Sequence, residues 1–341
     1  MITLIHELSD ILAVSGREQP VRDFLISRLP KDVTYRTDAM GNLFVSKKGT
    51  KGAGKNKVMV CAHMDEVGLI ITYITDEGYL KFAGVGGIDP AVLIGRTVVL
   101  ESGVPGVIGL KHIHICSKEE QQKIPEMKDL CIDIGAHSKE EAARYATLGS
   151  YACFQSNFVE FGSNNNRIKA KALDDRVGCA FMLKLIQSEL DYDTEFVFTV
   201  QEEVGARGAG PAAFQVEPDV ALILESTTAG DICDVTGNKR ACVLGEGPVV
   251  SYMDRGTVYD MDLYKTAFAV AEEKGIPCQT KTLVAGGNDS SSVQSAGAGS
   301  RVLAISVPTR YLHSPVCIMD KTDITSTMQL VEALLPVVAN D

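Results

Sequence analysis

The second half of the chain alternates short apolar runs with longer amphipathic stretches, and this pattern restricts the fold more than any other feature of the sequence. Strands are predicted at 168–172, 195–200, 220–224, 278–283 and 302–306, and helices at 174–190, 207–214, 259–274, after 289 and at 321–338. Such alternation is typical of an α/β domain in which helices cover a mainly parallel sheet. An earlier run at 58–62 is apolar at every position, as expected for a strand buried on both faces. We therefore place it in the same sheet.

Residues 67–165 interrupt this pattern with short β-like pieces, separated by glycines, and one short helix near 139–145. The pieces lie at 69–75, 79–82, 97–101, 107–111 and 131–134. They predict a small inserted domain that is β-rich and barrel-like. The flanking segments 1–66 and 166–341 would then form one discontinuous main domain. Because the insertion has strands and a core of its own, we expect that its removal leaves a site on the main sheet intact.

The composition excludes several classes of function. The chain has 33 basic and 44 acidic side chains, a formal charge of -11, and no basic cluster beyond residues 47–57, so nucleic acid is not an expected partner. No apolar run reaches about eighteen residues, so no membrane span is expected. The first ten residues are unlike a secretory signal peptide, and the nine cysteines contain no Cys-x-x-Cys pair. We expect a cytoplasmic protein with buried free thiols.

Side chains that can bind metals gather where the predicted strands end. Open α/β sheets bind ligands at the carboxyl ends of their strands, so these side chains are expected to meet. Such residues are also common in proteins without a metal: a histidine can be hydrogen-bonded, a Glu-Glu pair can be solvated, and an aspartate can cap a helix. The set consists of His63 after 58–62, Glu202 and Glu203 after 195–200, Glu225 after 220–224, Asp174 at a helix start, and His313 in the loop after 302–306.

Together these side chains predict a site for two divalent cations. If Asp174 bridges the two ions, each receives one histidine, the shared aspartate and one glutamate, and keeps an open position for water. Nitrogen and oxygen donors of this kind suit zinc, cobalt or manganese. Of the adjacent Glu202 and Glu203, one can bind an ion while the other takes a proton. Asp65 can hold the imidazole of His63 in the tautomer that a metal requires.

A second group of potential ligands, His112, His114 and Cys116, alternates along a region predicted as a strand and would share one face of it. No fourth ligand lies at a useful spacing. We therefore expect a packed or surface strand face at this position rather than a metal site.

Five motifs in the same order resemble the tetrahedral or deblocking aminopeptidases, a family of dinuclear metallopeptidases that includes glutamyl aminopeptidases. They are Val-Ser-Gly-Arg-Glu at 14–18, His-Met-Asp-Glu-Val-Gly at 63–68, Lys-Ala-Leu-Asp-Asp-Arg at 171–176, Glu-Glu-Val-Gly at 202–205 and Arg-Tyr-Leu-His-Ser-Pro at 310–315. The resemblance implies that His63, Asp174, Glu203, Glu225 and His313 bind the two ions. It also implies Glu202 as general base, Asp65 as a supporting residue, and peptides with a free N-terminus as substrates. The implied fold is a metallopeptidase domain whose inserted β domain helps to form large cytoplasmic homo-oligomers, commonly dodecamers.

Two positions depart from the family pattern. Many members have aspartate where this chain has Glu225, and threonine is frequent at the position of Asn288. Glutamate reaches one bond further than aspartate and still binds a metal, so the change affects metal preference and substrate fit. By their position, Asn288, Arg310 and Tyr311 are candidates for the substrate pocket.

Two other functions are compatible with paired acids. Glu202 and Glu203 could serve a glycoside hydrolase, and some relatives of this family carry a cellulase name. The chain has no tryptophan and only 6% aromatic residues to stack on sugar rings, and that chemistry gives the histidines no role. The remaining alternative is a metal-binding assembly protein without catalytic activity, although the chain retains Glu202 and every predicted ligand.

Overall fold

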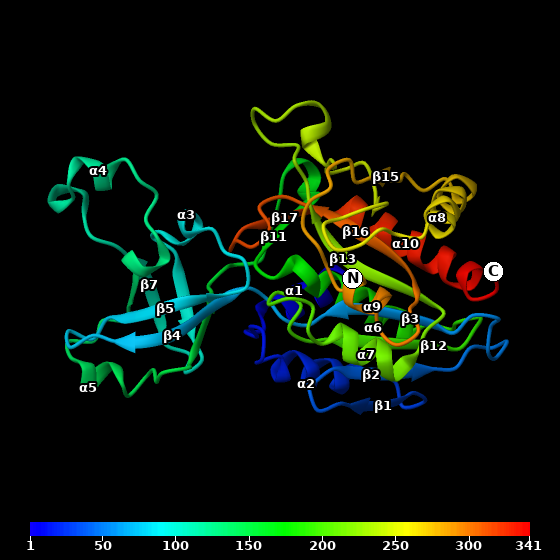
Figure 1. Ribbon diagram of the computed structural model, residues 1–341, viewed down its shortest axis with the longest axis horizontal. Helices are drawn as coiled ribbons and strands as arrows, with labels where there is room; N and C mark the ends of the chain where they lie inside the picture. Colours follow the sequence, from blue (N-terminus) through cyan, green and yellow to red (C-terminus); the bar gives the residue numbers. More distant parts are fainter.

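An eight-stranded mixed sheet forms the centre of the larger part of the molecule (Figure 1). The computed structural model describes residues 1–341, apart from the side chain of Glu120. In order across the sheet the strands are β1 (Thr34–Thr37), β2 (Leu43–Lys47), β12 (Thr194–Thr199), β3 (Val58–His63), β13 (Val220–Thr228), β16 (Arg301–Thr309), β14 (Val249–Val250) and β15 (Gln279–Thr280). Strands β12, β3, β13 and β16 run parallel to one another, whereas β2 pairs antiparallel with β12, and β14 with β16. The predicted α/β fold with a mainly parallel sheet is confirmed.

Strand β3 shows how both faces of the sheet are covered. Val58, Val60 and Ala62 belong to the core beneath the larger helices, whereas Met59 and Cys61 belong to the core on the opposite face. Successive side chains of a strand point to opposite faces, so a strand that is apolar at every position is buried on both. The interpretation of residues 58–62 is therefore correct.

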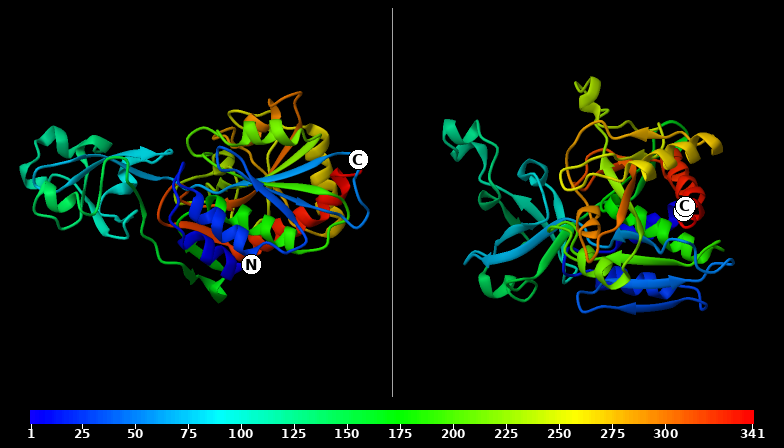
Figure 2. Two further views of the ribbon diagram at one scale, coloured as in Figure 1. Left: turned by 90° about the horizontal axis from the view of Figure 1, so that it is seen from below. Right: turned by 45° about the vertical axis from the view of Figure 1, so that its right-hand side comes forward.

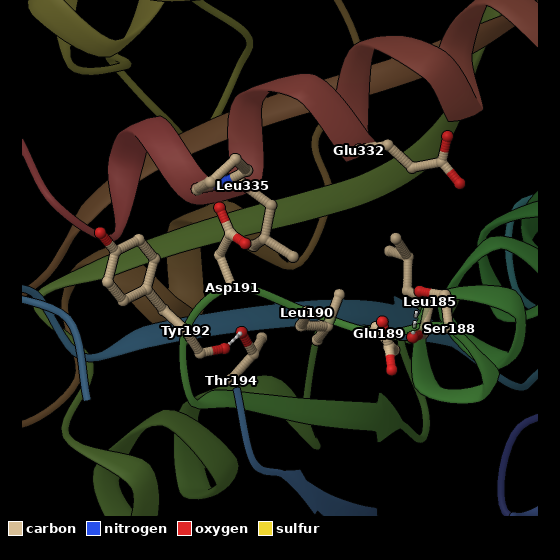
Figure 3. Close-up of a pocket in the computed structure, with 10 residues that line it drawn as sticks. Leu185, Ser188, Glu189, Leu190, Asp191, Tyr192, Thr194, Glu332 and Leu335 are labelled. Atoms are coloured by element: carbon tan, nitrogen blue, oxygen red, sulfur yellow. Dashed lines mark hydrogen bonds between the residues drawn. The ribbon is translucent and has the colours of Figure 1, made fainter. Parts of the chain in front are cut away.

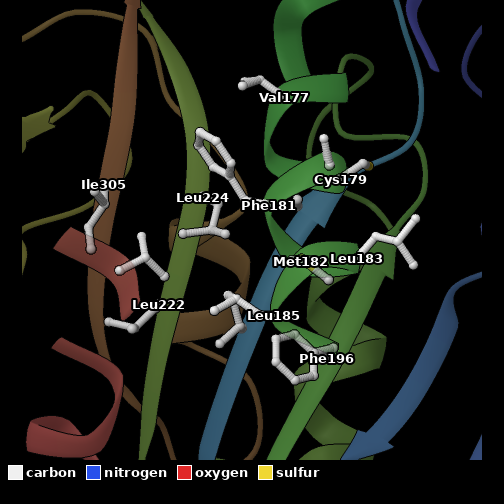
Figure 4. Close-up of a cluster of buried hydrophobic side chains, with 14 of the residues drawn as sticks. Val177, Cys179, Phe181, Met182, Leu183, Leu185, Phe196, Leu222, Leu224 and Ile305 are labelled. Carbon is white, nitrogen blue, oxygen red and sulfur yellow. The ribbon is translucent and has the colours of Figure 1, made fainter. Parts of the chain in front are cut away.

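The helices lie on the two faces of this sheet (Figure 2). Those that share the larger core are α1 (Ile2–Asp10), α2 (Gln19–Arg28), α6 (Leu173–Gln187), α8 (Met261–Lys274) and α10 (Lys321–Val338), and those on the opposite face are α7 (Ala209–Val216) and α9 (Ser290–Gln294). Figure 4 shows the larger core, where Phe181 and Leu185 of α6 lie beside Leu222 and Leu224 of β13. This packing fixes the start of α6 against the carboxyl end of the sheet. Helix α10 has the predicted bounds.

A closed barrel projects from one end of the main sheet and is coloured cyan to green in Figure 1. Its strands, in order around the barrel, are β4 (Gly68–Ile74), β5 (Leu80–Val85), β8 (Cys131–Asp133), β7 (Pro105–Gly109), β6 (Thr97–Leu100) and β9 (Tyr151–Phe154). Leu69, Ile71, Leu100 and Ile132 are among the residues of its separate apolar core. The prediction of an inserted β-barrel-like fold is confirmed.

Several local predictions differ from the structure. Residues 167–170 form β11 (Arg167–Ala170), which pairs with β10 (Val159–Phe161) and β17 (Cys317–Asp320) in a separate three-stranded sheet. The strand expected at 278–283 is reduced to the two residues of β15. His112 and Cys116 flank the 3₁₀ helix η1 (Ile113–Ile115), so a shared strand face with His114 does not exist. The prediction of a strand at this position is wrong, because a short exposed 3₁₀ turn can carry the same alternation of residue types as a strand.

The cysteines agree only in part with the expectation of buried free thiols. The nine cysteines are free, and Cys61, Cys153, Cys179, Cys242 and Cys317 are buried, but Cys116, Cys131 and Cys278 are half-buried and Cys233 is exposed. Among the helices of the described residues, none combines the length and the apolar character that a membrane span requires.

Candidate metal centre

Five segments bring the predicted ligands together at the carboxyl end of the parallel strands. His63 is the last residue of β3, Asp174 lies at the start of α6, and Glu203 follows β12 in the loop after Thr199. His313 comes from the loop between β16 and β17. Glu225 was predicted to follow its strand, but β13 continues to Thr228 and Glu225 lies inside it, opposite Ser306 of β16.

The ligands form two groups that share Asp174. In the first, His63 Nε2 lies 3.5 Å from Asp174 Oδ1 and 3.5 Å from Glu225 Oε1. In the second, His313 Nε2 lies 3.7 Å from Asp174 Oδ2 and 3.3 Å from Glu203 Oε2. Within each group all donor atoms lie within 4.8 Å of one another. The two oxygens of one carboxylate thus face two separate sets of donors, which is the arrangement that a bridging ligand requires.

Both imidazoles are oriented by backbone carbonyl groups. His63 Nδ1 donates to the carbonyl oxygen of Asp65 at 3.0 Å, and His313 Nδ1 donates to that of Gly87 at 2.7 Å. A carbonyl oxygen can only accept, so Nδ1 carries a proton in both imidazoles and Nε2 is the nitrogen that faces the carboxylates. Histidine ligands of metals are commonly fixed by such a hydrogen bond on the other nitrogen.

The bond from His313 to Gly87 also corrects the expectation that residues 67–165 are independent of the site. Gly87 lies in the inserted segment, after β5, and is separated from His313 by 226 positions in the chain. Without this carbonyl group, His313 would lose the hydrogen bond that fixes its tautomer. The inserted segment therefore contributes to one half of the site.

Asp65 lies beside His63, as predicted, and also supports the loop that carries the two glutamates. Its carboxylate lies 3.4 Å from His63 Nδ1, further than its own carbonyl oxygen. The carboxylate also accepts hydrogen bonds from the backbone N–H groups of Glu202 and Glu203, both at 3.1 Å, and from the hydroxyl of Ser15 at 2.6 Å. Asp65 thereby ties the loop with the two glutamates to the end of β3.

A second buried acid supports the same loop. Glu18 is 4% exposed, and its Oε1 accepts from the backbone N–H of Gly16 at 2.6 Å and from that of Gln201 at 3.1 Å. Gln201 has a positive φ of 58°, a conformation that costs free energy in a residue other than glycine. Ser15 and Glu18 lie in the motif at 14–18, yet spacing alone did not reveal that this segment contacts the loop of Glu202.

Asp174 and Asp175 are adjacent but have separate roles. Asp175 accepts hydrogen bonds from the backbone N–H groups of Gly178, at 3.0 Å, and His63, at 3.3 Å, so it is the aspartate that caps the start of α6. Asp174 Oδ1 is buried and has no hydrogen-bond partner. A buried carboxylate oxygen without a donor is costly, and a cation at this position would remove that cost.

The electrostatics of the centre favour cations as well. Burial, reinforced by the charges of neighbouring acids, raises the pKa of Glu202 and Glu203 well above the ordinary value. Burial likewise raises the pKa of Glu225 to about 8. For Asp174, burial acts in the same direction, but the nearby imidazoles of His63 and His313 outweigh it and lower the pKa. Without cations these acids therefore compete for protons, which divalent ions would replace.

A cavity of about 710 Å³ opens in front of the two ligand groups. Asn288 lines it, in agreement with its predicted place in the pocket, as does Glu202. Arg310 and Tyr311 are not among its lining residues. Arg310 instead binds Asp231 through two hydrogen bonds, from Nε at 2.8 Å and from Nη2 at 2.6 Å. Lys281 also lines the cavity but was not predicted from the sequence. A single lysine in a loop belongs to no motif or periodic pattern that would place it in the pocket.

Figure 3 shows a separate hollow of about 300 Å³ between the end of α6, the residues before β12 and α10. Glu189, Asp191 and Glu332 are its acidic side chains, and its lining includes neither histidine nor cysteine. The hollow thus lacks the mixed nitrogen and oxygen donors of the metal centre, and it lies away from the carboxyl end of the strands.

Comparison with known proteins identifies relatives along nearly the whole chain. Residues 41–330 match the family described as M42 glutamyl aminopeptidase. The lysyl aminopeptidase of Pyrococcus furiosus is 33% identical, and the match covers 97% of this chain and 96% of that protein.

Solved structures agree with this result. An aminopeptidase from the archaeon Desulfurococcus kamchatkensis has a TM-score of 0.91 and 38% identity, covering 97% of this chain and 93% of that one. The TET1 peptidase of Pyrococcus horikoshii, described as assembling into a tetrahedron or a large octahedral shell, has a TM-score of 0.85 and 36% identity, covering 98% of each chain. A protein of Thermotoga maritima described as an endoglucanase has a TM-score of 0.80 and 34% identity, covering 98% of this chain and 97% of that one.

Proposed function

Because this chain belongs to the M42 glutamyl aminopeptidase family, a family of metallopeptidases, we propose that it is a dinuclear metalloaminopeptidase that removes N-terminal residues from peptides. The observation that supports two ions rather than one is the position of Asp174, whose two oxygens face separate groups of donors. His63 and Glu225 complete the first ligand set. Glu203 and His313 complete the second.

The donor set fits zinc or cobalt, and manganese as a further candidate, since it contains imidazole nitrogens and carboxylate oxygens without a thiolate. When bound, the ions would supply Lewis acidity toward a water molecule and the scissile carbonyl group, and would anchor the free amine of the substrate. The orphaned Asp174 Oδ1 and the crowding of the surrounding acids, which together with burial raises the pKa of Glu203 and Glu225, are the features that favour this occupancy.

Glu202 is the proposed general base. It belongs to neither ligand set but lines the same cavity, and burial raises the pKa of its carboxyl group. Glu202 takes a proton from the attacking water as the oxygen bonds to the carbonyl carbon, and it returns that proton to the amine as the C–N bond breaks. Asp65 holds the backbone of Glu202 and thus aims its carboxylate, and Asn288 contacts the substrate from another part of the cavity wall.

A glycoside hydrolase is the second candidate, because one similar structure is described as an endoglucanase. The arrangement of the two glutamates argues against it. Glu203 Oε2 lies 3.3 Å from His313 Nε2, within a histidine and carboxylate cluster that sugar hydrolysis does not need. A metal-binding protein without catalytic activity is less compatible with Glu202, since this half-buried acid lines the cavity and serves no ligand set.

We also propose that residues 1–66 and 166–341 form the catalytic domain and that residues 67–165 take part in a homo-oligomer, as large as a dodecamer. The assemblies described for the TET1 peptidase support this proposal. So do the exposed apolar side chains Ile113, Ile115 and Ile124, which lie on the segment between β7 and β8.

Aminoacyl-p-nitroanilides, assayed with each divalent metal in turn, test the proposed function. Release of nitroaniline should require added metal and should be abolished when the amino group of the same substrate is acetylated, because the free amine must reach the metal centre. Rapid cleavage of an acetylated peptide at an internal bond would remove the aminopeptidase assignment. Hydrolysis of cellulose oligomers in the presence of a chelator would favour the second candidate.

A further inference from the structure

A buried tyrosine and a buried aspartate lie behind Asn288, which lines the cavity. Tyr259 is 3% exposed and belongs to the core that α7 and α9 cover, together with Cys61 of β3 and Val302 of β16. Asp254 is 2% exposed and lies in the tight turn between Met253 and Val258, which form a single β-bridge. Both side chains are therefore held in place by the fold, and neither lines the cavity itself.

The hydroxyl group of Tyr259 lies between Asp254 and Asn288. Its oxygen is 2.5 Å from Asp254 Oδ2 and 3.1 Å from Asn288 Nδ2. The other carboxylate oxygen, Asp254 Oδ1, accepts from the backbone N–H groups of Gly256, at 2.8 Å, and Thr257, at 2.7 Å. The carboxylate thus has a fixed orientation, and the hydroxyl connects it to the amide group of Asn288.

The protons available determine the direction of these hydrogen bonds. A carboxylate can only accept, so the single proton of the Tyr259 hydroxyl is donated to Asp254. Burial and the charge of Asp254 raise the pKa of Tyr259, so the hydroxyl keeps this proton near neutral pH. Its oxygen can then only accept from Asn288, whose Nδ2 is the donor. At the other end of the amide, Asn288 Oδ1 accepts from the backbone N–H of Ser290 at 2.8 Å.

This network leaves one hydrogen of Asn288 Nδ2 for a ligand. An amide nitrogen carries two hydrogens, and among the hydrogen bonds of the described residues Nδ2 forms only the one to Tyr259. Asn288 is half-buried and shares the cavity wall with Glu202. The next residue, Asp289, accepts from the hydroxyl of Thr199 at 2.6 Å. The segment with Asn288 is therefore tied to the end of β12, the strand that leads to Glu202.

We propose that Asn288 donates a hydrogen bond to a backbone carbonyl oxygen of the peptide substrate, and that Tyr259 and Asp254 are positioning residues that keep its Nδ2 turned for this contact. This inference rests on the proposed aminopeptidase function and adds the chemistry of one substrate contact. A donor requires an acceptor, and the peptide backbone supplies a carbonyl oxygen whatever its side chains. The oxygen has two sources, the carbonyl group of the scissile bond and that of the residue that follows it.

Two substrates distinguish these carbonyl groups. Leu-p-nitroanilide has only the scissile one, whereas Leu-Ala-amide has both. If the scissile carbonyl is the acceptor, Asn288→Ala should lower kcat for both substrates by about tenfold or more, because negative charge develops on that oxygen in the transition state. If the following carbonyl is the acceptor, Asn288→Ala should raise KM about tenfold for Leu-Ala-amide alone, because that oxygen does not change during the reaction.

Three variants connect this contact to its support. Tyr259→Phe keeps the ring but removes the oxygen that accepts from Asn288, so it should change the same constant for the same substrates as Asn288→Ala. In the double variant it should add little, because it acts through Asn288.

Asp254→Asn should have a similar effect even if Tyr259→Phe fails to fold. The new amide oxygen can still accept from the backbone, so the amide nitrogen faces Tyr259 and reverses the direction of the hydrogen bonds. Tyr264→Phe is the matched control. The hydroxyl of Tyr264 donates to Thr280 at 2.9 Å, and both residues lie outside the cavity lining, so its loss should leave the kinetics unaltered.

The outcomes separate the two levels of inference. Wild-type kinetics of Asn288→Ala with both substrates would overturn the substrate contact and leave the aminopeptidase function standing. A loss through Tyr259→Phe that is equally large in the absence of Asn288 would overturn the positioning role. If the metal-loaded wild-type enzyme hydrolysed neither substrate, the proposed function would fail and the inference with it.

Discussion

Removal of the metals should make the stability of the protein strongly dependent on pH. In the metal-free protein the pKa of Glu225 is about 8, against an ordinary value of 4.5 that applies to the unfolded chain. Between these two values the folded state binds the proton and the unfolded state does not. A folded pKa that is raised in this way means that the free energy of unfolding falls as pH rises from about 4.5 to 8.

The magnitude follows from the same shift. Each pH unit inside this window costs about 1.4 kcal/mol per titrating group, so Glu225 alone should lower the stability by about 2.5 kcal/mol between roughly pH 5.5 and 7.5. Glu202 and Glu203, whose pKa values are also raised by burial, act in the same direction. Bound cations would hold their ligands Glu203 and Glu225 ionised, so the loaded protein should show a much weaker dependence.

The assay is urea unfolding of chelator-treated and metal-loaded protein across this pH range. Glu225→Gln is the matched control, because it keeps the size of the side chain and removes the titrating group. The chelated variant should show a shallower fall in stability and should exceed the chelated wild type near pH 7.5. If the chelated wild type were as insensitive to pH as the loaded protein, or if Glu225→Gln left the slope unchanged, the acids would not share the buried environment described above.

Three further sets of variants test other parts of the site. Glu202→Gln should leave the metal content unchanged and lower kcat on the order of 10²–10⁴-fold. Glu203→Gln should lower the metal content, and its activity should recover partly at high metal concentration. Elemental analysis and kinetics measure both effects, and the assignment of the two glutamates would be reversed if the two results were exchanged. Deletion of residues 67–165 with the flanks joined should give smaller particles by size-exclusion chromatography, and an unchanged particle size would rule out a role in assembly. The same deletion should weaken the binding of one ion, because His313 loses the carbonyl group of Gly87. Glu18→Ala should lower kcat more than it changes KM, and Glu18→Gln should restore much of the loss because an amide oxygen still accepts from the loop; equal effects of both variants would contradict a positioning role.

The sequence predicted the parts of the fold and site that depend on periodicity and topology. Residues 58–62 are apolar at every position because β3 is covered on both faces, and parallel strands on either side bring their carboxyl ends to one edge. His63, Asp174 and Glu225 therefore met as expected. The general location of the candidate metal centre required no knowledge of individual contacts.

The contacts that complete the site could not be predicted from the sequence. The carbonyl group that orients His313 belongs to Gly87. Every residue has a backbone carbonyl oxygen, so residue types do not indicate which one forms this bond. Glu18 contacts Gln201 across 183 positions, and a glutamate near the start of a helix is more often a solvated side chain that interacts with the helix dipole. The strand at 168–172 was assigned to the main sheet because periodicity predicts a strand but does not identify the sheet to which it belongs.

The two histidines of the proposed metal centre are held under different constraints. His63 ends a central strand and its side chain is 2% exposed, whereas His313 lies in a loop, at a positive φ of 56°, with a side chain that is 38% exposed. An ion beside His63 would be bound by a side chain on a buried central strand, whereas an ion beside His313 would be bound by a side chain on a loop, whose rearrangement would release it. The two positions should therefore exchange metal on different timescales, with one ion resident for the lifetime of the fold and the other in equilibrium with the surrounding pool.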